Sequence, residues 1–86
     1  MAESLDELLA RMKSEIEQAE HGSLDRAELA RLAEAVERRL RDEQHDQHDQ
    51  HLVDELRSGV RRLEATHPSL ASAIGRLADG LAGMGL

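Results

Sequence analysis

The chain has 86 residues, of which 34% are charged and 40% are hydrophobic, and it contains no Phe, Tyr, Trp or Cys. This composition is typical of one small soluble domain, and the missing cysteines exclude a disulfide framework and a thiolate zinc site. A formal net charge of −7 disfavours binding to nucleic-acid phosphates. No stretch is apolar enough to span a membrane, and acidic residues occupy the place of a signal peptide, so we expect a cytoplasmic protein.

The amino-acid composition predicts an all-α fold, because Leu, Ala, Glu and Arg dominate and only six residues are Val, Ile or Thr. A first helix is predicted over about 5–20, where Ser4 and Glu7 have the spacing of a capping box. We expect His21 and Gly22 to end this helix. Its apolar stripe recurs at alternating steps of four and three residues, at Leu5, Leu9, Met12, Ile16 and Ala19.

A second helix is predicted from Asp25 to about residue 43. Asp25 and Glu28 form another capping box, and Leu24 and Leu29 occupy the two positions of a hydrophobic staple. The short connection over 22–24 predicts that the first two helices form an antiparallel hairpin.

Residues 44–51 form a low-complexity repeat of Gln, His and Asp without an apolar residue. The apolar stripe of the second helix does not continue through this segment, so we predict a linker or a kink over 44–51. The stripe resumes out of phase in a third helix, predicted over about 50–66, at Val53, Leu56, Val60 and Leu63.

A fourth helix is predicted from Pro68, whose missing N–H costs nothing at a first helical position. It carries a stripe of large residues, namely Leu70, Ile74, Leu77, Leu81 and Met84, beside a stripe of small ones, namely Ala71, Gly75, Ala78 and Ala82. The small residues would let a second helix approach closely, so we predict that this stripe makes a dimer contact. Gly80, Gly83 and Gly85 are expected to unwind the end of the helix.

Three segments of the sequence are similar to those of a known protein family. They are the Leu-rich opening around Leu5 and Leu8, His67-Pro68 followed by Leu70, and the ending over 81–86. The chain resembles the short bacterial proteins catalogued as domain of unknown function 4404. The resemblance implies a bacterial, cytoplasmic, helical protein. It implies no functional residue, because the family has no assigned activity.

Histidine-containing motifs raise the alternative of a metal-binding protein, since imidazole is a good ligand for Zn, Ni and Cu. His45, His48 and His51 repeat at steps of three, which on a helix places the first and third about 120° apart and prevents them from facing one ion. Glu64 and His67 have the Glu-x-x-His spacing of di-iron bundles, which need two such motifs and further carboxylates. We favour a solvated linker for the repeat and a capping role for His67.

A second alternative is a nucleic-acid-associated regulator. It would use arginines of the second and third helices, if these lay side by side: Arg38, Arg39 and Arg41 with Arg57, Arg61 and Arg62. Acidic residues interleave with all of them, as on ordinary ion-paired helix faces.

No catalytic or cofactor motif is present in the sequence, and we predict neither an enzyme nor a bound cofactor. We expect a small bundle of three to four amphipathic helices, starting with the helical hairpin and completed by dimerisation. The predicted function is a non-enzymatic protein–protein interaction module, with no membrane contact.

Overall fold

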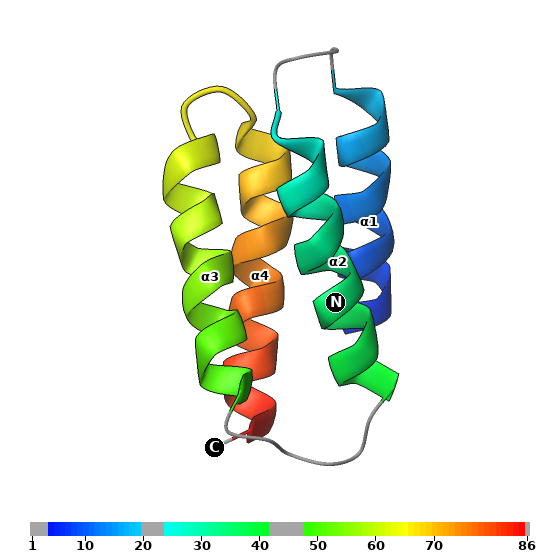
Figure 1. Ribbon diagram of the computed structural model, residues 1–86, viewed down its shortest axis with the longest axis vertical. Coiled ribbons are helices and arrows are strands. Elements are labelled where there is room, and N and C mark those ends of the chain that lie inside the picture. The colour runs from blue at the N-terminus through cyan, green and yellow to red at the C-terminus, as the bar shows by residue number, and fades with distance from the viewer. Residues whose placement is uncertain (1–3, 20–23, 42–47, 86) are drawn as a thin grey trace.

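The computed structural model describes residues 4–19, 24–41 and 48–85, and these residues form four helices joined in sequence order. The helices are α1 (Leu5–Gln18), α2 (Arg26–Arg41), α3 (His48–Leu63) and α4 (Pro68–Gly85). They run alternately up and down, so that each is antiparallel to the next (Figure 1). Each helix contacts its neighbours in the chain, and α4 closes the bundle by packing against α1. The predicted all-α bundle and its opening antiparallel hairpin are confirmed.

The capping residues predicted at the starts of the first two helices act as caps in α1 and α2. The Glu7 N–H donates to Ser4 Oγ at 3.1 Å, and the Ser4 N–H donates to Glu7 Oε1 at 3.5 Å, which completes the capping box of α1. At α2, the Glu28 N–H donates to Asp25 Oδ1 at 3.1 Å. These side chains satisfy backbone groups that have no partner within the helix.

α1 ends at Gln18, earlier than predicted, and a residue of α2 explains why. Ala19 leaves the helix in an extended conformation, and the Arg26 guanidinium donates to its carbonyl oxygen. No basic residue of α1 lies in its own last turn. Arg26 therefore supplies, from the next helix, the positive charge that stabilises a helix C-terminus.

α3 begins at His48 and ends at Leu63, whereas the sequence predicted about 50–66. The last four residues of the predicted linker are therefore helical, and residues 44–47 lie outside the described residues. Beyond Leu63 the chain turns, and the N–H groups of Thr66 and His67 both donate to the Leu63 carbonyl, at 3.1 and 2.7 Å. Pro68 opens α4 as predicted, and the His67 carbonyl accepts the Ala71 N–H at 2.9 Å.

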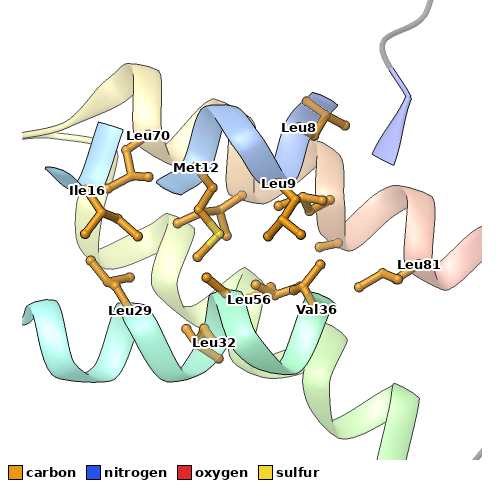
Figure 2. Packing of buried hydrophobic residues seen from close by; sticks show 14 of the residues in the cluster. Leu8, Leu9, Met12, Ile16, Leu29, Leu32, Val36, Leu56, Leu70 and Leu81 are labelled. Atoms are coloured by element: carbon orange, nitrogen blue, oxygen red, sulfur yellow. The ribbon is translucent and has the colours of Figure 1, made fainter. Parts of the chain in front are cut away.

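Aliphatic side chains from all four helices fill the centre of the bundle (Figure 2). Met12 of α1, Val36 of α2, Leu56 of α3 and Leu77 of α4 are each 0% exposed. The predicted stripes of the four helices thus meet in one core. The core is closed by the helices of a single chain, so a second copy is not needed to complete the bundle.

The small-residue stripe of α4, where we predicted a dimer contact, lies inside the chain. Ala71 and Ala78 are buried, at 3% and 0% exposure, and Ala82 is half-buried against the core. A Cβ added at Gly75 would lie 3.6 Å from Val60 Cγ2 of α3. The close neighbour that the stripe predicts is α3 of the same chain.

Glycines near the end of α4 do not unwind it, since the helix continues through Gly85. An added Cβ at Gly80 would overlap Leu5 Cδ2, at the first residue of α1. A side chain at position 80 would therefore require the half-buried Leu5 side chain to shift. This contact lies between elements distant in the sequence, and local glycine content could not indicate it.

We predict that alanine substitutions at Gly75 and Gly80 have different effects on stability. Alanine favours a helix over glycine by about 1 kcal/mol. At Gly75 the new methyl group meets Val60 at an ordinary contact distance, so Gly75→Ala should raise the free energy of unfolding by about 0.5–1 kcal/mol. At Gly80 the overlap with Leu5 should cancel that gain or reverse it. Urea denaturation of both variants measures the difference, and equal stabilities would contradict the packing of α1 on Gly80.

Candidate functional site

A cavity opens on the surface between α2 and α3, which pack together less closely than the other neighbouring helices. It has a volume of about 180 Å³ and lies beside the start of α2 and the end of α3. We call it the α2–α3 groove. Its lining consists of Leu24, Asp25, Glu28, Leu29, Gly59, Arg62, Leu63 and Thr66.

The apolar part of the groove is built by residues that also contact the core. Leu29 is buried, whereas Leu24 and Leu63 are half-buried and pack against the core cluster. Leu24 precedes the N-cap of α2 and Leu29 follows one turn later, which is the predicted hydrophobic staple. Folding of the α2 N-terminus therefore also places two leucines at the groove.

Gly59, although its own backbone is buried, leaves a gap at the groove. It lies in the interior of α3, between Leu56 and Leu63, and a Cβ added there would have no heavy atom within 4 Å. Glycine in a helix interior costs about 1 kcal/mol relative to alanine. Unlike Gly80, Gly59 is not required by a close contact among the described residues. Its missing side chain leaves space that α2 does not fill.

An ion pair joins the two helices at the edge of the groove. Arg62 Nη2 lies 2.7 Å from Glu28 Oε1 and Arg62 Nη1 lies 3.2 Å from Glu28 Oε2, a two-bond geometry that holds both side chains in place. The hydrogen bond from Arg62 lowers the pKa of Glu28, and the Glu28 carboxylate raises the pKa of Arg62. Asp25, on the same edge, is exposed. The groove thus has an apolar interior and a charged edge.

The predicted metal ligands are not brought together where the structure describes them. His45 and the side chain of His48 lie outside the described residues, and His51 Nε2 lies 2.6 Å from Glu55 Oε1 on the exposed side of α3. Glu64 is exposed and His67 is half-buried, in the connection between α3 and α4. Within 4–19, 24–41 and 48–85, no three His, Asp or Glu residues are grouped to hold a metal ion.

The two groups of arginines do not form one basic patch. α2 and α3 lie side by side, as that prediction required, but they are antiparallel (Figure 1). With Glu28 level with Arg62, the centre of the α2 group lies about nine residues, or roughly 13 Å, along the axis from the centre of the α3 group.

Most of these arginines also have acidic neighbours or are buried. Arg41 lies 3.6 Å from Glu37, and Arg57 lies 3.5 Å from Asp79. Arg39 is buried, at 7% exposure. The separation of the two groups and these contacts leave the predicted nucleic-acid surface without a continuous positive face.

Sequence reasoning identified the leucines of the groove only as core residues and did not single out Gly59. The sequence of α3 did indicate a gap, because a glycine interrupts its apolar stripe. The stripe has steps of four, three and four residues, at Leu52, Leu56, Gly59 and Leu63. A glycine in such a stripe leaves a gap on the face that packs against a neighbour. Which helix faces that gap depends on the tertiary arrangement.

Comparisons with known proteins assign the chain to a family only. The family model described as Domain of unknown function (DUF4404) matches residues 5–86. No curated protein and no solved structure matches the chain. Among the described helices, none is both long and apolar enough to cross a membrane.

We predict that Gly59→Ala stabilises the protein by about 0.5–1 kcal/mol, because the added methyl group improves helix propensity and meets nothing within 4 Å. Thermal unfolding followed by circular dichroism measures the change. Gly75→Ala serves as the matched control in the neighbouring helix. A destabilised Gly59→Ala variant would show that position 59 is closely packed and that the groove is not open there.

The Glu28–Arg62 pair predicts a loss of stability in acid. The pKa of Glu28 in the folded protein lies below its ordinary value of 4.5, so the pair contributes in full above that value, and its contribution is lost as the pH falls through the lowered pKa. Glu28→Gln should therefore lower the melting temperature at about pH 7, and this effect should shrink as the pH falls below 4.5 and through the lowered pKa. A difference between the two proteins that does not change with pH would contradict this role for Glu28.

Proposed function

Given that the chain belongs to the DUF4404 family, whose description assigns no activity, we propose that it is a non-enzymatic helical module that binds another protein in the α2–α3 groove. The observation that carries this proposal is Gly59. Glycine costs its helix about 1 kcal/mol relative to alanine, and Gly59, unlike the equally uncrowded Gly83, lines the groove. We take this lost helix propensity at the groove as the sign that the space there has a use.

The chemistry of the groove suits a protein partner. Leucines line its interior, and charged side chains stand at its edge, which is the arrangement of an apolar centre and a polar rim found at protein interfaces. A volume of about 180 Å³ is small for a drug-sized ligand. It suits one anchoring side chain, and such anchors dominate the energy of many interfaces.

Because the small-residue stripe of α4 is buried, we do not propose self-association through that helix. Ala71 and Ala78 are buried within the single chain, so they present no surface to a second copy. The α2–α3 groove, in contrast, is open in a complete bundle. We therefore place the interaction on the groove.

Affinity capture with a blocked groove tests this function. Gly59→Leu places a side chain in the open space, whereas Gly75→Ala changes a helix-interior glycine away from the groove. Wild-type protein and the Gly75→Ala variant, immobilised and exposed to a lysate of the source cells, should retain the same proteins. Gly59→Leu should lose them while keeping its helical circular dichroism.

Retention of the same proteins by Gly59→Leu would place the binding surface elsewhere and overturn the proposal. A wild-type protein that retains nothing above the level of a blank resin would overturn it as well. Gly59→Ala, which we expect to be more stable than wild type, provides a second, smaller obstruction of the groove that does not depend on how well leucine is tolerated.

A further inference from the structure

We infer that the α2–α3 groove accepts an aromatic side chain from a basic segment of a different protein. This inference rests on the proposed function and adds to it the chemistry of the partner. Three observations carry it: the size of the cavity, the residues available to a second copy, and the charge at the edge of the groove.

The size of the cavity fits an aromatic ring. An engineered apolar cavity of about 150 Å³ binds benzene, and the groove has about 180 Å³ beside three leucines, Leu24, Leu29 and Leu63. The absence of a side chain at Gly59 allows a flat ring to lie close to the α3 backbone. A branched aliphatic side chain would leave part of this volume empty, and unfilled space forfeits contacts.

A second copy of this chain cannot supply the ring. The sequence contains no Phe, Tyr or Trp. Each copy also carries a formal charge of −7, so two copies repel each other at long range. The ring must therefore come from a different protein.

The edge of the groove favours a positive charge next to the ring. Its charged residues are Asp25, Glu28 and Arg62, so their sum is −2 + 1 = −1. Arg62 is bound by Glu28 at 2.7 Å. Asp25 caps α2 through Oδ1, and its exposed carboxylate keeps a negative charge that can face a cation on the partner. The net charge of the whole chain has the same sign and would attract a basic segment during association.

Small probes test ring and charge separately. Phenethylamine, protonated near neutral pH, carries a ring and a cation; phenylacetate carries a ring and an anion; isoamylamine carries a cation on a branched aliphatic chain. Methyl chemical shifts of Leu24, Leu29 and Leu63 report binding in the groove. We expect phenethylamine to change the methyl shifts of all three leucines. Phenylacetate should bind about two- to fivefold more weakly, which is the effect of losing one exposed ion pair. Isoamylamine should also bind more weakly than phenethylamine.

Two variants control the location of the probe. Gly59→Leu should abolish the shifts caused by phenethylamine, and Gly75→Ala should leave them unchanged. Asp25→Asn should remove most of the preference for phenethylamine over phenylacetate. Asn is as good an N-cap as Asp, so this variant should keep the start of α2.

Equal binding of isoamylamine and phenethylamine would overturn the inference of an aromatic ring, and equal binding of phenylacetate would overturn that of a basic segment. Absence of phenethylamine shifts would overturn both. The proposed function is judged separately, by capture: proteins lost on Gly59→Leu support it even if phenethylamine does not bind, whereas phenethylamine binding without groove-dependent capture counts against it.

Discussion

Close packing of α4 against its two neighbours is the constraint on which the rest of the bundle depends. A chain without aromatic residues has no large rings to fill wide gaps between helices, so the helices must approach one another closely for aliphatic side chains to close the core. α4 allows this approach on two sides. Gly75 and the adjacent alanines face α3, and Gly80 accommodates Leu5 of α1.

The same packing explains why the seam between α2 and α3 is looser than the others. α2 contains no glycine, and its edge toward α3 is joined by the Glu28–Arg62 pair. A pair exposed to this extent contributes little to stability, so it links the two helices without packing them closely. The groove forms beside it, where Gly59 contributes no side chain.

Local chemistry made much of the fold predictable. The capping residues Ser4 and Asp25 act on backbone groups three positions away, and Pro68 excludes a helix that continues from α3, so these boundaries follow from short stretches of sequence. The apolar stripes likewise predicted most of the core, although Leu8 and Ala73 are buried outside them. The contacts of each stripe could not be predicted in the same way, because periodicity gives a face of a helix but not the neighbour that covers it.

Two differences between the prediction and the structure show this limit. The end of α1 depends on Arg26, which reaches the Ala19 carbonyl from the next helix. The small stripe of α4 indicated a close neighbour, and the structure supplies α3 where the sequence suggested a second copy. In both cases the residue types were informative, and the partner was decided by tertiary packing.

Among the described glycines of α3 and α4, only Gly80 would bring an added Cβ into overlap with a neighbour, whereas Gly59 and Gly83 have no neighbour within 4 Å, and of these two Gly59 lines the α2–α3 groove. Gly80 has no room for a side chain, and Gly75 lies at contact distance from Val60. Gly59 has open space where a side chain would be, although alanine there would favour the helix by about 1 kcal/mol. A residue that weakens its own helix without improving packing is the kind of local conflict that natural sequences keep at functional surfaces. Because Gly59 combines this conflict with a position in the lining of a cavity, it is the physical indication on which we place the binding of a partner.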